Sequence, residues 1–274
     1  MFSNLEKNAA KIADKRFGQN FLKESSVLDK IIEAMPKDGL PVVEIGPGLG
    51  DLTRQLIRVG HVRAYEVDKR LCEHLKNEFN EPLKSGKLEL ICKDVLEQSE
   101  SLQDSEYSLV ANLPYYIATK IILNALHDKS CKRILVMVQK EVAKKFAANS
   151  RAKEFGSLAV LAQSVADVKL LFDVPPEAFV PPPKVTSAIL YIEKRSSLDD
   201  KGFEEFLKVA TKQPRKTLLK NLSTFYSKAL LEKLFIQLGI GLKTRSHEIE
   251  LSNYHLLYKE LKKDRGDESG EQRG

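Results

Sequence analysis

A glycine-rich turn near the start of the chain has the composition of a ligand-binding loop. It reads Glu44-Ile45-Gly46-Pro47-Gly48-Leu49-Gly50 and lies between a short apolar run and a stretch with helical spacing. Such glycines let the backbone approach a ligand, and the N-terminus of the helix that follows offers free N–H groups. A tight strand-to-helix turn without a ligand is the alternative. We expect Gly46 and Gly48 to line a site for a nucleotide-like cofactor.

A carboxylate at a suitable distance supports this expectation. Glu66 lies 20 residues after Gly46, in the next predicted strand. From there a carboxylate can accept hydrogen bonds from both hydroxyls of a ribose. NAD and S-adenosylmethionine both carry such a ribose, but the Gly-x-Gly-x-Gly spacing favours S-adenosylmethionine, which has no pyrophosphate to cradle. Asp94, after the third predicted strand, is placed to meet the adenine amine of the cofactor, and a helix N-cap is its alternative role.

One short motif suits chemistry on an aromatic amine, namely Asn112-Leu113-Pro114-Tyr115 at the end of the fourth predicted strand. The exocyclic amine of adenine is a poor nucleophile because its lone pair is delocalised into the ring. The side-chain oxygen of Asn112 and the main-chain oxygen of Leu113 can each accept one N–H, which directs the lone pair at a methyl donor. Pro114 fixes its own φ and helps to hold that carbonyl, and Tyr115 offers a ring face to an extruded base. A strand end followed by proline, with the tyrosine packed on the rim, is the alternative.

These motifs require a sheet that brings strand ends together. Apolar or β-branched runs alternate with stretches of helical spacing from residue 42 onward, an order typical of a parallel sheet with crossover helices. The predicted strands cover residues 42–45, 62–67, 88–92, 107–111, 133–138 and 185–192. The predicted helices between them cover residues 51–59, 69–79 and 117–126. The five prolines of residues 173–183 indicate an extended connection. The sequence therefore predicts an α/β, doubly wound domain.

The last part of the chain has a different pattern. After residue 195, helical periods without strands cover residues 203–211, 216–222, 228–238 and 253–262. Residues 266–274 are polar and contain glycine. We therefore predict an α/β domain over residues 1–195, a small all-helical domain over 196–265, and a disordered tail over 266–274.

The composition is that of a folded, soluble protein. Of the 274 residues, 42% are apolar and 30% are charged, and no apolar run reaches the roughly 18 residues that a membrane helix needs. We expect a cytoplasmic protein without a membrane partner. The net charge of +6 permits a polyanionic partner without proving one. Cys72, Cys92 and Cys131 fit neither a disulfide framework nor a metal site, so we expect reduced, mostly buried thiols.

Taken together, the motifs resemble those of a known family, the small-subunit ribosomal RNA adenine dimethyltransferases, which is the kasugamycin-sensitivity family of bacteria. The resemblance covers about residues 15–265. It rests on Glu66, Asp94 and four runs: Phe17-Gly18-Gln19-Asn20-Phe21-Leu22, Glu44-Ile45-Gly46-Pro47-Gly48-Leu49-Gly50, Asn112-Leu113-Pro114-Tyr115, and Phe179-Val180-Pro181-Pro182-Pro183-Lys184-Val185.

The resemblance implies a Rossmann-like class I methyltransferase domain with S-adenosylmethionine as methyl donor and no metal. By that resemblance Asn20 and Leu22 close over the cofactor, whereas without it Gln19, Asn20 and Phe21 favour a simple loop before an N-terminal helix. Gly46 is implied to line the methionine part of the cofactor. Glu66 is implied to hold the ribose, and Asp94 to meet the adenine.

The same resemblance assigns roles around the target base. Asn112 is implied to border both the cofactor and the target, and Phe179 to stack on the target adenine opposite Tyr115. On the residues alone, a phenylalanine in a proline-rich connection more often fills the core. We expect direct, in-line methyl transfer without a covalent enzyme intermediate or a dedicated general base, so that positioning and electrostatics carry the catalysis.

A basic run in the helical part indicates contact with RNA. No acidic residue occurs between Glu205 and Glu232, while that interval contains Lys212, Arg215, Lys216 and Lys220. A solvated helical face is the alternative. Beside an RNA-modifying site, and with residues 213–219 resembling the family's helical domain, we expect these four side chains to contact phosphates.

The function expected from this resemblance is that of an rRNA adenine N6,N6-dimethyltransferase. Its target would be two adjacent adenosines near the 3′ end of 16S ribosomal RNA, presented by the immature small subunit, and the enzyme would act as a monomer. Two alternatives stay open. One is a large-subunit rRNA methyltransferase that confers antibiotic resistance, and the other is a non-catalytic ribosome-assembly or transcription factor of the same fold.

Overall fold

The computed structural model describes residues 9–14, 17–98 and 101–271, without the side chains of residues 11 and 264–271. Two compact units make up the chain. The first comprises Met1–Ala143 and Val165–Ser197, and the second comprises Lys144–Ser164 and Leu198–Gly274. The second unit therefore also contains Lys144–Ser164, which the sequence pattern assigned to the first domain.

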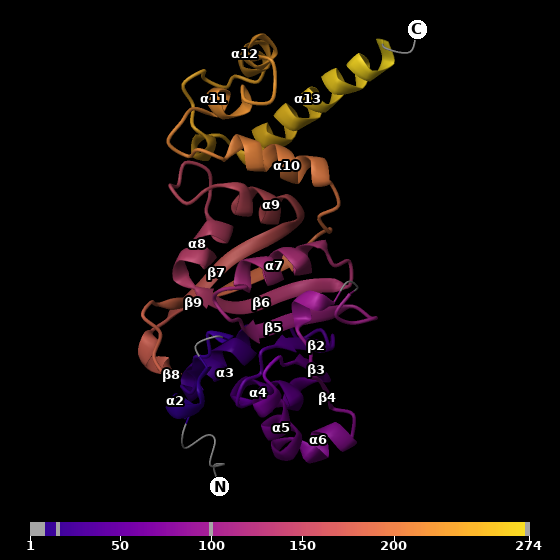
Figure 1. Ribbon diagram of the computed structural model, residues 1–274, viewed down its shortest axis with the longest axis vertical. Helices are drawn as coiled ribbons and strands as arrows, with labels where there is room; N and C mark the ends of the chain where they lie inside the picture. Colours follow the sequence, from indigo (N-terminus) through magenta and orange to yellow (C-terminus); the bar gives the residue numbers. More distant parts are fainter. Residues whose placement is uncertain (1–8, 15–16, 99–100, 272–274) are drawn as a thin grey trace. The chain divides into compact units, whose positions relative to one another are not determined.

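A seven-stranded sheet forms the first unit (Figure 1). Its strands, in spatial order, are β4 (Leu88–Ile91), β3 (Val62–Tyr65), β2 (Val42–Ile45), β5 (Tyr107–Asn112), β6 (Cys131–Gln139), β9 (Ser187–Lys194) and β7 (Ala166–Val174). The first five are parallel, whereas β9 runs antiparallel to both β6 and β7. The expected α/β, Rossmann-like class is confirmed.

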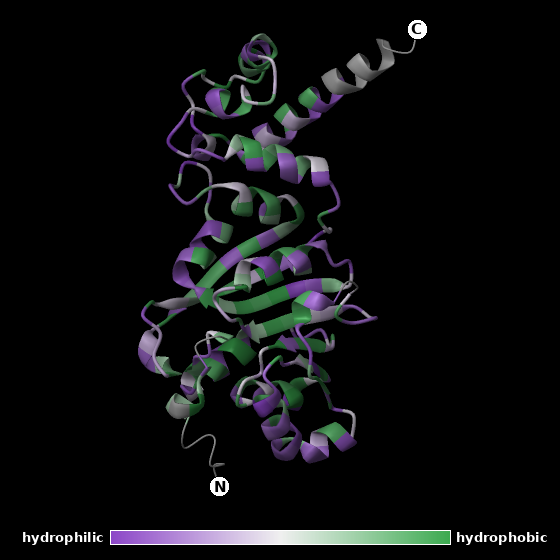
Figure 2. Ribbon diagram, in the orientation of Figure 1, coloured by the Kyte–Doolittle hydropathy of each residue, from purple (hydrophilic) through white to green (hydrophobic). Residues whose placement is uncertain are grey.

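The central strands are buried on both faces, and apolar residues dominate both faces rather than alternating with polar ones. All four residues of β2 and the first five of β5 are buried, and Figure 2 shows hydrophobic colour along β5 and β6. Helix α4 (Asp51–Val59) adds Leu52 and Leu56 to the same core, four residues apart on one helical face. The other helices of this unit are α2 (Ala9–Ile12), α3 (Ser25–Ala34), α5 (Lys69–Glu78), α6 (Asn80–Lys84) and α7 (Ala118–His127). Helix α8 (Lys140–Ala147) begins here and ends in the second unit.

The sequence pattern did not predict three of the strands. Strand β7 alternates outward and inward residues as a half-buried strand does, but the apolar run 170–172 obscures that alternation. The other two are β1 (Phe21–Leu22) and β8 (Phe179–Val180), which pair antiparallel as a separate two-stranded sheet. The proline-rich stretch is therefore more than a connection. It contains a short 3-10 helix over Pro176–Ala178 and then β8, which fastens the segment to the N-terminal part of the chain.

The second unit is helical, as its pattern predicts. It contains α9 (Ser157–Val165) except for its last residue, α10 (Lys201–Ala210), α11 (Leu218–Leu222), α12 (Lys228–Gln237) and α13 (Leu251–Glu271). Aromatic rings of α10 and α13 pack together, with the centroids of Phe206 and Tyr258 5.5 Å apart. The segment before α9 joins this unit through Arg151, whose backbone N–H donates to His247 O over 2.7 Å. That hydrogen bond gives a local reason why residues 144–164 group with the C-terminal helices.

Helix α13 extends through Glu271, whereas the sequence predicted a disordered tail from residue 266. A single glycine costs a helix interior only about 1 kcal/mol, so Gly266 does not end the helix. Residues 272–274 of the predicted tail lie outside the described residues. No helix in the described ranges has the length and apolar character needed to cross a membrane.

The expectation for the cysteines was wrong for two of them. Cys72 on α5 and Cys92 directly after β4 form a disulfide, with their Cα atoms 6.1 Å apart. Cys92 is also exposed rather than buried. The spacing along the chain gave no sign of this pairing, because only the sheet brings the start of α5 beside the end of β4. Cys131 is a free, buried thiol, as expected.

Candidate active site

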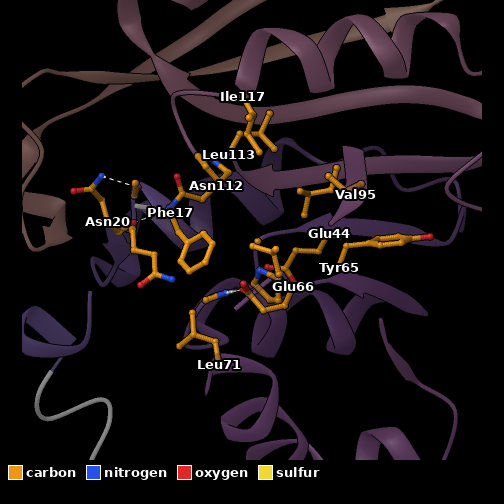
Figure 3. Close-up of a pocket in the computed structure, with 18 of the residues that line it drawn as sticks. Phe17, Asn20, Glu44, Tyr65, Glu66, Leu71, Val95, Asn112, Leu113 and Ile117 are labelled. Atoms are coloured by element: carbon orange, nitrogen blue, oxygen red, sulfur yellow. Dashed lines mark hydrogen bonds between the residues drawn. The ribbon is translucent and has the colours of Figure 1, made fainter. Parts of the chain in front are cut away.

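One cavity of about 1140 Å³, including its open mouth, lies in the first unit where β2, β3, β4 and β5 end. Figure 3 shows side chains from several of these strand ends around the same space. The wall is made by residues 17–22, the glycine-rich loop, the end of β3, the turn after β4 and the segment after β5. The predicted site residues in this wall are Asn20, Leu22, Gly46, Gly48, Glu66, Asp94, Asn112, Leu113, Pro114 and Tyr115. The fold thus brings together motifs that lie far apart in the sequence.

The glycine-rich loop adopts a backbone that only glycine takes without strain. Gly46, Gly48 and Gly50 have φ values of 70°, 62° and 85°. A Cβ on Gly48 would lie 3.0 Å from the ring of Phe21, so residues 17–22 and the loop are in close contact here. Gly50 is the N-cap of α4, which begins at the cavity wall. The loop is therefore a close-fitting backbone cradle.

Glu66 is a buried carboxylate that the backbone holds in place. Its Oε2 accepts a hydrogen bond from the N–H of Gly48 over 3.2 Å, and its Oε1 accepts one from the N–H of Asp68 over 2.9 Å. Each oxygen still has a lone pair for a ligand hydroxyl. Burial raises the pKa of the Glu66 carboxyl to about 7, against the lowering effect of the two backbone N–H groups. A carboxylate that donors orient in this way suits the two hydroxyls of a ribose.

Glu44 is a second buried acid in the wall, and sequence reasoning gave it no role of its own. The hydroxyl of Thr53 on α4 donates to its Oε2 over 2.7 Å. Burial raises the pKa of Glu44 to about 8, and the nearby Glu66 carboxylate also contributes to this increase. The signal was present, because Glu44 opens the glycine-rich run that the sequence singled out.

Asp94 fulfils its alternative role and still belongs to the site. Its Oδ1 accepts from the N–H of Leu96 over 2.9 Å and so caps the short 3-10 helix Val95–Glu97. Its side chain is also part of the cavity wall. The cap fixes the carboxylate in one orientation, so the two roles are compatible.

Asn112 at the end of β5 joins two distant parts of the wall. Its Nδ2 donates to the main-chain oxygen of Asn20 over 3.1 Å, and Figure 3 shows both residues beside the cavity. This hydrogen bond fixes the orientation of the amide, and the amide oxygen, which is its acceptor atom, is left to accept from a ligand. The N–H of Leu113 donates to Met137 O over 3.1 Å, which anchors the residue that follows. In the described chain no hydrogen bond uses the carbonyl of Leu113.

Residues 17–22 form a strap along the wall, and sequence reasoning named only two of them as site residues. The Nε2 of Gln19 donates to Asp68 Oδ2 over 3.0 Å, which ties the strap to the residues after β3. Asn20 ties it to β5 through Asn112, and β1 ties it to β8. Phe17 and Gln19 also line the cavity. The strap therefore spans from the carboxylate side of the site to the amide side.

Phe179 does not line this cavity. It is 2% exposed and packs in the core that also contains Leu22, its partner in the β1–β8 pair. This position agrees with the expectation that a phenylalanine in a proline-rich connection fills the core. A stacking role of Phe179 on a target base stays a prediction.

The predicted RNA-contacting side chains lie in the second unit. Lys212, Arg215, Lys216 and Lys220 are all exposed, in the connection from α10 to α11 and on α11 itself. Among the described residues none of the four forms an ion pair, whereas Lys228 on α12 pairs with Glu232 at 3.5 Å. These charges are therefore available to an anionic partner.

Comparison with known proteins gives one consistent result. The family described as "Ribosomal RNA adenine dimethylase" matches residues 10–263. The "Ribosomal RNA small subunit methyltransferase A" of Sulfurimonas denitrificans is 54% identical over 250 residues, which cover 90% of this chain and 93% of that protein. The protein of the same name from Aliarcobacter butzleri is 50% identical over 258 residues, covering 92% and 97%.

Solved structures show the same fold at lower identity. A dimethyladenosine transferase from Plasmodium falciparum superposes with a TM-score of 0.76 and 24% identity, over 89% of this chain and 98% of that one. The 23S rRNA methyltransferase ErmE superposes with a TM-score of 0.68 and 24% identity, over 89% and 100%. At this identity the likeness concerns the fold alone.

Proposed function

The chain belongs to the ribosomal RNA adenine dimethylase family, and on that premise we propose that it dimethylates the exocyclic amines of two adjacent adenosines near the 3′ end of 16S ribosomal RNA. It is thus an rRNA adenine N6,N6-dimethyltransferase, and the resemblance found in the sequence is confirmed. The observation that carries the reaction is the geometry of Asn112. Its N–H is held by Asn20, which leaves its oxygen for a ligand in the cavity that Glu66 shares.

The residues of the cavity fit S-adenosylmethionine as methyl donor. Glu66 would bind the ribose hydroxyls, Asp94 the adenine amine, and the backbone of Gly46 and Gly48 the methionine part. Gly46 and Gly48 both have positive φ values and line the cavity, so their backbone meets a ligand without intervening side chains. The wall also carries Glu66 and Asp94, whose carboxylates complement a cationic ligand when they are ionised. When bound, the cofactor supplies an electrophilic methyl group on a sulfonium.

The chain itself positions the nucleophile. The oxygen of Asn112 accepts one N–H of the adenine amine, and the carbonyl of Leu113 accepts the other, so the lone pair of the nitrogen is aimed at the methyl donor. Pro114 fixes the backbone at this point. Tyr115 presents its ring to the base, which must leave its stack to enter the cavity. Orientation of this kind can supply about 7 to 11 kcal/mol of the barrier.

The same two oxygens also stabilise the charge that develops during the reaction, and water can take up the proton. The two accepting oxygens become better partners as positive charge develops on the amine, so they stabilise the transition state more than the ground state. Methylation makes the amine strongly acidic, and its proton passes to water at the open mouth of the cavity. No step in this scheme requires a side chain to act as general base.

We further propose that the helical unit docks the enzyme on the immature small subunit, with phosphate contacts from Lys212, Arg215, Lys216 and Lys220. Four basic side chains on one segment, none of them in an ion pair within the described chain, can be neutralised by the closely spaced phosphates of RNA. In this scheme the enzyme acts as a monomer in the cytoplasm.

Methyl transfer to unmethylated small subunits tests the proposal directly. Subunits from a strain without the enzyme are incubated with labelled S-adenosylmethionine, and the labelled nucleotides are mapped. We expect two dimethylated adenosines near the 3′ end of the 16S RNA. Label on large-subunit RNA alone would favour the resistance methyltransferase, and binding without transfer would favour a non-catalytic assembly factor.

A further inference from the structure

A hydrogen bond links the base-facing tyrosine to a serine that no motif includes. The hydroxyl of Tyr115 lies 2.6 Å from Oγ of Ser187, 72 residues further along the chain. Ser187 is fully buried, whereas Tyr115 is only partly buried and lines the cavity. The bond therefore ties a side chain of the site to a point inside the sheet.

The sheet fixes the serine end of this bond. Ser187 is the first residue of β9 and is paired on both sides, with Gln139 of β6 and Val174 of β7. The residue before it is held as well, because the N–H of Lys140 donates to Thr186 O over 3.0 Å. A hydroxyl on such a strand has little freedom to move, so it is a fixed anchor.

The tyrosine end lacks such support. Tyr115 lies between β5 and α7, outside both elements. Its backbone follows Pro114, but its side chain can turn about two torsions, and each turn changes the direction of the ring face. A hydrogen bond at the far end of the ring fixes the first torsion, and hence the position of the ring. It restrains the second torsion through the phenol O–H, which prefers to lie in the plane of the ring. The ring is then held at its Cα and at its hydroxyl.

We propose that Ser187 is a positioning residue for methyl transfer, which fixes the ring of Tyr115 so that its face meets the target adenine. This inference rests on the proposed function, since it presumes that Tyr115 contacts the base. Ser187 touches neither the base nor the cofactor in this account. It acts only through the orientation of the tyrosine.

Substitution of Ser187 separates this role from a structural one. For Ser187→Ala we expect kcat to fall about tenfold, because small misplacements at a reacting centre are costly. KM for S-adenosylmethionine and the affinity for small subunits should stay within about twofold. Ser187→Thr keeps the hydroxyl on a β-branched residue that a strand accepts, so it should restore most of the rate. Ser108→Ala, at another buried serine near the far end of β5, should leave kcat unchanged.

The partner variant tests the same bond from the other side. Tyr115→Phe keeps the ring but removes its hydroxyl, so it should lower kcat about as much as Ser187→Ala does, and the double variant should be no slower than either. A double variant whose kcat falls by the product of the two single effects would overturn the inference. A Ser187→Ala enzyme with the wild-type kcat would overturn it too. If Ser187→Ala does not fold, a Tyr115→Phe enzyme with the wild-type kcat would overturn it as well.

The outcomes also distinguish this inference from the function on which it rests. A wild-type enzyme that transfers no methyl group to small subunits would refute the proposed function. An active wild type with an unaffected Ser187→Ala variant would refute only the role of Ser187.

Discussion

Acidification should weaken the binding of S-adenosylmethionine, and Glu66 sets the size of the effect. Its pKa in the free enzyme is about 7, because the carboxyl is buried. Only the ionised form can accept hydrogen bonds from both ribose hydroxyls. With this pKa the ionised fraction is about 0.9 at pH 8 and about 0.1 at pH 6. Since an apparent Kd scales inversely with the competent fraction, the Kd should rise about tenfold, or about 1.4 kcal/mol, across that range.

Titration calorimetry with the free enzyme at several pH values between 6 and 8 measures this dependence. Unfolding would not explain the loss of affinity. A group whose pKa is higher in the folded state than in the unfolded chain stabilises the fold as the pH falls through the folded pKa. Protonation of Glu66 therefore makes the free fold more stable at pH 6 than at pH 8. Glu66→Gln should bind weakly throughout and lose the tenfold step. A wild-type Kd that is flat over the whole range would refute this role of Glu66.

Three further outcomes test other parts of the site. Asn112→Ala should reduce the single-turnover methylation rate at least about 100-fold. The melting temperature should fall by only a few degrees, because the fold loses one hydrogen bond. A methylation rate within a few-fold of wild type would count against the amine-orienting role. Gly48→Ala should raise the Kd for S-adenosylmethionine more than tenfold, whereas Gly86→Ala, also at positive φ but with open space around it, should not. Neutralising Arg215 and Lys216 should weaken the binding of the small subunit without changing the affinity for the cofactor. The slope of the logarithm of the binding constant against the logarithm of the salt concentration should become shallower by about 1.5. An unchanged slope would reject the phosphate contacts.

The parallel sheet could be predicted from local pattern because its strands are short runs dominated by apolar residues, separated by stretches with helical spacing. The predicted strand over residues 42–45 and the helix over 51–59 coincide with β2 and α4. Strand β7 was missed because its alternation is broken by an apolar run. Strands β1 and β8 have two residues each, too few for any periodicity.

The candidate site was predicted to the extent that it lies in continuous motifs. Asn112 and Glu66 each follow from a motif and its spacing. The bond from Asn112 to Asn20 spans 92 residues, and the bond from Tyr115 to Ser187 spans 72. Such pairs depend on the packing of the whole sheet, so no local pattern contains them. For the same reason the local sequence does not determine the burial of Phe179, which depends on the pairing of β8 with the distant β1.

The central claim is that the oxygens of Asn112 and Leu113 hold the adenine amine, and a structure of the ternary complex tests it most directly. The enzyme would be bound to a non-reactive analogue of S-adenosylmethionine and to an adenosine-containing RNA. We predict the exocyclic nitrogen within about 3 Å of both oxygens, with the sulfonium position of the analogue in line. An adenine whose amine lies elsewhere, with the side chain of Asn112 turned away from it, would contradict the account.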